Sequence, residues 1–134
     1  MEPKFAQFNV YDGLMVHVEL GAKTPNIEEF REFIAGIAQL LDNAQPFTFF
    51  VDASKLKSVP LSTSLETVAF LRKERARIKL YMKASAIFVK SEFITNLLNW
   101  VFTLQPPVSP NKVVNEPQDG MVFIQQYMTN IIEN

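Results

Sequence analysis

Few side chains in this chain could carry catalysis. There is no cysteine, and His17 is the single histidine, so the residues offer no thiol nucleophile, no disulfide and no metal site built on several histidines. His17 stands between Val16 and Val18, and no Gly-x-Ser-x-Gly elbow occurs that could pair a serine with it. We therefore expect a surface histidine, no metal, and a protein that is not an enzyme.

Two short polar stretches are candidate loop sites. Asp52 and Ser54 end a strongly apolar run, and Ser62 and Thr63 precede a predicted helix. An acid at the carboxyl end of a central strand stands where α/β proteins often bind ligands, but it commonly caps the following loop. A phosphate on a serine at a helix start would be stabilised by backbone amides, although capping is the simpler role. No Gly-x-Gly-x-x-Gly or Walker sequence occurs, so we expect no cofactor.

Charge is unevenly distributed along the sequence. The net charge is −1, but nine of the thirteen Lys and Arg residues lie between Lys55 and Lys90, where only two acids occur. Arg72, Arg75 and Lys79 belong to a basic helix that could meet an acidic protein or a phospholipid headgroup. Nucleic acid is an unlikely partner, because the overall charge is negative and no aromatic residues interleave with the bases. A solvated helix face is the plain alternative.

The segment 92–105 is unusually apolar and forms the second part of a candidate interaction surface. Its apolar side chains cover more than half of a helix, and they include Phe93, Leu97, Trp100 and Phe102. Such a helix is either deeply buried or presents a patch to a protein partner, a second copy of the chain or an acyl ligand. The sequence leaves these alternatives open.

The elements that must position these residues follow from hydrophobic periodicity and from turn and capping residues. Strands are predicted over 5–12, 14–20, 47–53, 84–90 and 111–115, with an Asp12-Gly13 hairpin turn between the first two. Helices are predicted from Pro25 to about Leu41, from a Thr63/Glu66 capping box to about Tyr81, over 92–105 with Ser91 as cap, and from Pro117 onward.

This order of elements, ββαβαβαβα, predicts the fold class. Strands separated by helices need crossover connections, so we expect an α/β fold with a mostly parallel five-stranded sheet and one antiparallel hairpin strand. The length of 134 residues fits a single domain, 1–134. The chain begins without a signal-peptide pattern and contains no run of the roughly 18 apolar residues that a membrane span needs. Together with the absence of cysteine, this predicts a cytoplasmic protein.

The same order resembles the STAS domains and the related SpoIIAA-like group, in which a strand ends in Asp-x-Ser before a loop and a helix. Here that motif is Asp52-Ala53-Ser54. The resemblance implies a non-enzymatic regulatory or protein-interaction module, with a protein partner or a homodimer. STAS regulators usually carry a phosphorylated serine in Asp-Ser-Ser-Gly before the next helix, and this chain departs from that motif with Pro60, Leu61, Ser62 and Thr63.

A second resemblance covers the stretch 86–115. With Phe93, Leu97, Trp100, a Pro-Pro loop and a short Val113-Val114 strand, this stretch is similar to the core of the Sec14 or CRAL-TRIO lipid-binding group. It implies the alternative function, a small binder or sensor of an apolar ligand such as a lipid.

Overall fold

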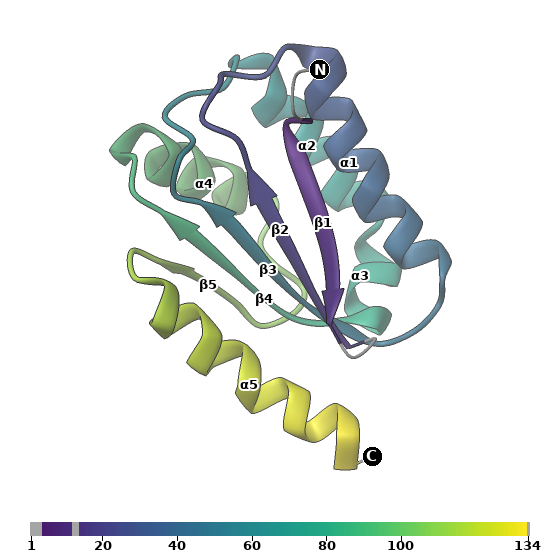
Figure 1. Cartoon of the computed structure of the whole chain (residues 1–134). Helices are drawn as coiled ribbons and strands as arrows, with labels where there is room; N and C mark the ends of the chain where they lie inside the picture. The colour runs from purple at the N-terminus through teal and green to yellow at the C-terminus, as the bar shows by residue number, and fades with distance from the viewer. Residues whose placement is uncertain (1–3, 12–13, 134) are drawn as a thin grey trace.

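Figure 1 shows a computed structural model of the protein, which describes residues 4–11 and 14–133. The elements in chain order are β1 (Ala6–Tyr11), β2 (Met15–Leu20), α1 (Ile27–Asp42), β3 (Phe47–Ala53), α2 (Ser62–Lys73), α3 (Arg75–Tyr81), β4 (Met82–Val89), α4 (Glu92–Leu104), β5 (Asn111–Val114) and α5 (Pro117–Glu133). All five predicted strands are present. The predicted turn at Asp12-Gly13 lies outside the described residues.

The sheet follows the order of the chain, β1-β2-β3-β4-β5. β1 and β2 pair antiparallel, with Phe8 opposite Val18, whereas β2, β3, β4 and β5 pair in parallel. The predicted fold class is therefore confirmed: this is an α/β fold with a mostly parallel sheet and one antiparallel hairpin strand.

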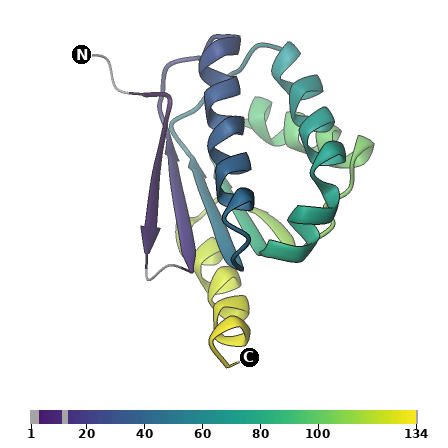
Figure 2. The same ribbon diagram turned by 90° about the vertical axis from the view of Figure 1, so that its right-hand side faces the viewer.

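The helices divide unequally between the two faces of the sheet. Crossovers between parallel strands are nearly always right-handed, so a sheet that adds each new strand on the same side receives its crossover helices on one face. α1, α2, α3 and α4 accordingly share one face, and α5, which follows the edge strand β5, packs on the other face against β3, β4 and β5 (Figures 1 and 2).

β3 lies at the centre of the sheet and is buried on both faces. Phe49 and Val51 point toward the layer of α1 to α4, and Phe50 points toward α5. Phe50 is 2% exposed, and a Cβ added at Gly120 of α5 would lie 2.6 Å from its Cε2 atom. Glycine at this position therefore lets α5 approach the sheet closely.

Capping residues set the starts of two helices. Asn26 caps α1 in a capping box with Glu29, so the helix begins at Ile27 and the predicted start at Pro25 is two positions too early. Ser91 caps α4 as predicted, because its Oγ accepts the amide of Ile94 at 3.2 Å.

The predicted Thr63/Glu66 capping box is wrong. α2 begins at Ser62 with no side-chain cap, and the Thr63 hydroxyl donates backward to the carbonyl of Pro60 at 2.7 Å. The Glu66 carboxylate is also engaged elsewhere, since it accepts from Arg31 of α1. Thr63 is already the second residue of the helix, so it does not occupy the capping position that the prediction gave it.

The single helix predicted to run to Tyr81 is two helices, because the chain leaves helical geometry at Glu74 with φ −97° and ψ 11°. The Glu74 side chain is buried and bonds to the guanidinium of Arg77, which also bonds to Asp42 at the end of α1. These hydrogen bonds hold the pKa of Arg77 above its ordinary value. A buried carboxylate needs such a partner, and hydrophobic periodicity does not reveal it.

The close packing at Gly120 can be tested by substitution. Gly120→Val should lower the free energy of unfolding by about 1–3 kcal/mol, because the new side chain would overlap Phe50 and Val114. Gln125→Val places the same β-branched residue on an exposed position of α5 and should cost under about 1 kcal/mol. Urea unfolding of both variants measures the difference. Equal losses would contradict the close approach of α5 to the sheet.

Candidate functional site, an apolar cavity

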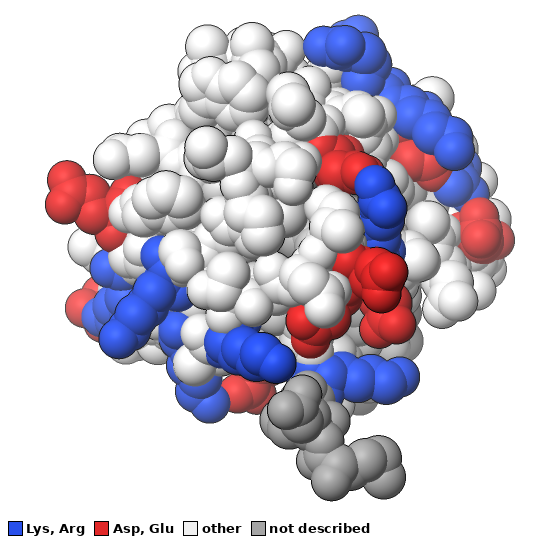
Figure 3. Space-filling view, turned by 90° about the horizontal axis from the view of Figure 1, so that it is seen from above, with Lys and Arg blue, Asp and Glu red and all other residues white. Residues whose placement is uncertain are grey.

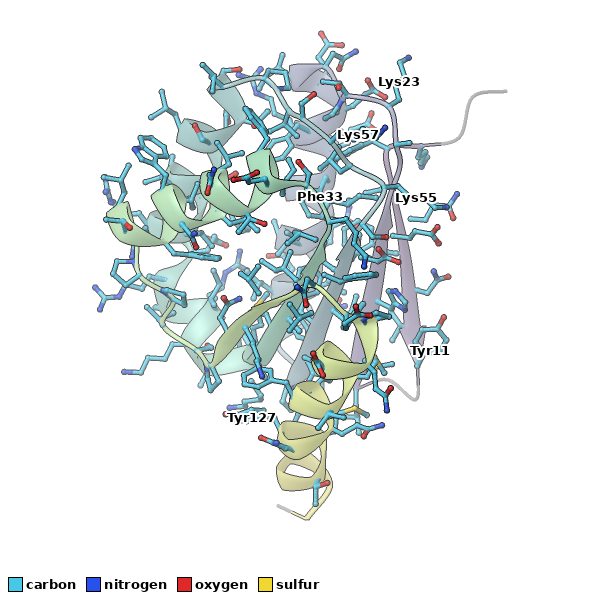
Figure 4. The ribbon with its side chains drawn as sticks, turned by 90° about the vertical axis from the view of Figure 1, so that its left-hand side faces the viewer. Tyr11, Lys23, Phe33, Lys55, Lys57 and Tyr127 are labelled. Atoms are coloured by element: carbon cyan, nitrogen blue, oxygen red, sulfur yellow. The ribbon has the colours of Figure 1, made fainter. Side chains whose placement is uncertain are left out.

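A cavity of about 190 Å³ lies between the sheet and the layer of α1 to α4. Its floor comes from β2, β3, β4 and β5, and its walls come from all four helices and from the loop that follows α4. Figure 4 shows Phe33 of α1 pointing into this space. Representative lining residues are Phe30, Phe33, Phe49, Ile87, Leu97 and Phe102.

Aromatic side chains of α1 and of the segment that leads into β1 pack together at one side of the cavity. Phe30 and Phe33 of α1 meet edge to face with centroids 5.8 Å apart, and Phe33 in turn packs on Phe5 at 6.1 Å. Edge-to-face contacts stabilise aromatic clusters and fix their geometry. On the opposite face, α5 presents Gly120 to the sheet, and that layer closes tightly.

The apolar helix α4 has two different sides. Leu97 and Phe102 are half-buried and line the cavity, whereas Phe93 and Trp100 are 43% and 45% exposed. The four residues predicted as one interaction surface therefore belong to two places. One pair is part of the cavity wall, and the other pair faces outward.

The basic residues of the candidate surface also come from two helices. Arg75 and Lys79 are exposed and stand four residues apart on α3, so they share one face of that helix. Arg72 lies near the end of α2, and its Nε donates to Oε1 of Gln105 at 3.4 Å. The structure thus separates Arg72 from the other two by the break at Glu74.

Folding brings two of the basic residues of 55–90 into contact with acids from the first 52 residues. Lys55 pairs with Glu19 of β2 at 3.1 Å, and Arg77 pairs with Asp42 as well as Glu74. Figure 3 shows blue and red side chains side by side around a broad uncharged area. The basic region expected from the sequence is thus interrupted by acids from the first 52 residues.

The candidate loop residues form two local hydrogen-bonded turns. The amide and hydroxyl of Ser54 both donate to Oδ1 of Asp52, at 3.0 and 2.6 Å. This is the arrangement of an acid that caps its own loop. Ser62 is exposed at the start of α2, whereas Thr63 is buried and lines the cavity.

His17, predicted as a surface histidine, is half-buried. It lies on the α5 side of β2, where its ring meets that of Phe50 at 5.0 Å and that of Tyr11 at 6.3 Å. Its Nε2 atom is buried and has no hydrogen-bond partner among the described residues. Phe50 of β3, which covers one side of the ring, is more than thirty residues away in the chain, so no local pattern indicates this contact.

Two further findings concern the part of the chain that the structure describes. It contains no group of three or more His, Cys, Asp or Glu residues placed to hold a metal ion. Within the same residues, no helix combines the length and apolar character that crossing a membrane requires.

Sequence reasoning did not find the cavity. Its walls come from segments spread between Leu20 and Asn111, and no local pattern marks residues that share a void. The one feature of the sequence that pointed to it was the excess of apolar residues in 92–105. Some of these residues line the cavity, and others lie on the outer surface.

Comparison with known proteins gives a fold relative. Neither a scan of known protein families nor a search of curated proteins finds a match. Among solved structures, the chain is similar to an uncharacterised protein of the DUF3478 family from Shewanella loihica, which has a SpoIIAA-like fold. The TM-score is 0.61 at 12% identity, and the match covers 89% of this chain and 91% of that one. The protein therefore has a SpoIIAA-like fold, as the sequence resemblance implied.

The two sides of α4 can be distinguished by substitution. Ile94 is 4% exposed and lines the cavity, so Ile94→Ala should lower the free energy of unfolding by about 2–5 kcal/mol. Trp100→Ala removes a larger but half-exposed side chain and should cost no more than about 1 kcal/mol. Chemical denaturation measures both values. A larger loss for Trp100→Ala would show that the Trp100 side chain is part of the core.

Proposed function

We propose that the protein is a non-enzymatic binding module that holds a small apolar ligand between its sheet and α1 to α4. The apolar cavity is the observation that carries this proposal, because pockets for small ligands are concave, mostly apolar and formed before the ligand arrives. The second sequence resemblance, to lipid-binding proteins, supports the same ligand class. We also propose that the protein acts in the cytoplasm, as the sequence predicts.

The size of the cavity limits the ligand. A cavity of about 190 Å³ exceeds the roughly 150 Å³ apolar cavity that binds benzene in an engineered protein. It is smaller than the roughly 300–1,000 Å³ of pockets for drug-sized molecules. A single ring with a short alkyl chain, or a comparable segment of a longer molecule, matches this volume.

A protein-interaction role, the first implication of the sequence resemblance, is the second candidate. Phe93 and Trp100, together with Leu104, leave large apolar side chains exposed on α4. Exposed aromatic residues are typical of interface cores, where they contribute much of the binding energy. A regulatory module could use this outer side of α4 while the inner side holds the ligand.

Ligand binding can be measured by thermal unfolding with n-butylbenzene. A ligand that binds only the folded protein raises the stability by about 2.7 kcal/mol at a hundredfold excess over Kd, so Tm should rise by several degrees. Leu98→Trp adds volume inside the cavity and should abolish the rise. Leu104→Trp, the same change on the exposed side of α4, should preserve it.

The outcome depends on both variants being folded, which circular dichroism and their own unfolding curves establish. A rise in Tm that persists in Leu98→Trp would place the ligand outside the cavity. No rise in the unaltered protein, with this or a smaller ring such as toluene, would contradict the proposed function.

The interaction role has a separate test in the oligomeric state. The double variant Phe93→Ser, Trp100→Ser should be monomeric under conditions where the unaltered protein is a dimer, because it removes exposed apolar area without altering the core. Sedimentation or native mass spectrometry measures the subunit number. Leu61→Ser, which changes an exposed residue on α2, is the control. An unaltered dimer in the double variant would exclude this face as the interface.

A further inference from the structure

The cavity wall contains no ionisable side chain. Among the residues that the structure describes, those lining the cavity include no Asp, Glu, Lys, Arg or His. Six of them are polar but uncharged, namely Thr63, Thr67, Ser85, Gln105, Ser109 and Asn111. Burying an isolated charge without a partner is strongly unfavourable, whereas a neutral polar group needs only hydrogen bonds. The interior therefore disfavours a charged headgroup.

Four of the six polar residues already use their hydrogen-bonding groups within the fold. Thr63 donates to the carbonyl of Pro60 at 2.7 Å, and Thr67 donates to the carbonyl of Thr63 at 2.8 Å. Ser109 donates to the carbonyl of Ile78 at 3.2 Å. Gln105 accepts from the exposed Arg72, which places its amide at the rim of the cavity.

Ser85 and Asn111 are different, because the hydrogen bond between them leaves one donor and one acceptor that a ligand can use. They are cross-strand partners on β4 and β5, and Nδ2 of Asn111 donates to Oγ of Ser85 at 2.7 Å. Since the Ser85 oxygen accepts this bond, its own hydrogen is left to donate. The Asn111 amide oxygen is an acceptor beside it. The backbone amide of Ser85 is fixed by the carbonyl of Pro110 at 2.9 Å, so the pair stands on a rigid part of the sheet.

We propose that the ligand is an uncharged amphiphile whose hydroxyl or carbonyl oxygen is held by the Ser85–Asn111 pair while its apolar part fills the cavity. This inference rests on the proposed function and specifies its ligand class. An alcohol can accept from the Ser85 hydroxyl and donate to the Asn111 oxygen, an aldehyde, ketone or ester can only accept, and a hydrocarbon can do neither. A ligand with a carboxylate could bind only if the carboxylate stayed at the rim of the cavity, next to Arg72.

Three ligands of similar size test this inference by calorimetric titration at neutral pH: n-butylbenzene, 3-phenyl-1-propanol and 3-phenylpropanoate. We expect the alcohol and the hydrocarbon to bind, and the anion to bind at least tenfold more weakly than the alcohol. Ser85→Ala should weaken alcohol binding roughly 3- to 10-fold, the effect of one net hydrogen bond, and change hydrocarbon binding by less than about twofold. Ser62→Ala, which changes an exposed serine of α2 outside the cavity wall, should leave both affinities unaltered.

The outcomes separate this inference from the proposed function. If the anion binds as tightly as the alcohol, the neutral-ligand inference is wrong, and loss of that binding in Arg72→Gln would identify the rim as the headgroup site. If Ser85→Ala affects alcohol and hydrocarbon equally, the pair does not hold the polar group. If none of the three ligands binds to the folded protein, the proposed function itself fails.

Discussion

The constraint on which the structure depends is the sequential order of the strands. Each parallel strand is added beside the previous one, so the right-handed crossovers bring α1, α2 with α3, and α4 to a single face. Only α5, which follows the edge strand, is left for the other face. One face of a five-stranded sheet therefore receives four helices and the other receives one. The cavity lies on the face that receives the four helices.

Side-chain size then determines how each layer closes. Opposite α5, Gly120 allows a backbone-to-ring contact with Phe50, and Ala84 and Ala86 complete a thin, closely packed core. On the other face, phenylalanines project from both the helices and the sheet, and the cavity lies among them.

The order of elements and the sheet type could be predicted from sequence because they rest on local periodicity. The strand Phe47–Ala53 and the Ser91 cap match the structure for that reason. The break at Glu74 could not be predicted, because the buried Glu74 pairs with Arg77, which also pairs with Asp42, more than thirty residues away in the chain. The cavity could not be predicted either, because its wall consists of residues from many segments that only the folded topology brings together.

The cavity has a thermodynamic consequence that favours a ligand. Apolar side chains that line a cavity lack contacts on its open side, so the cavity lowers the stability relative to a fully packed core. Larger side chains at a few wall positions such as Leu98 would recover part of that cost, and the Ser85–Asn111 pair would be unnecessary in a core that served packing alone. The neutral amphiphile that we propose would restore the missing contacts with its apolar part and bond to the polar pair with its oxygen.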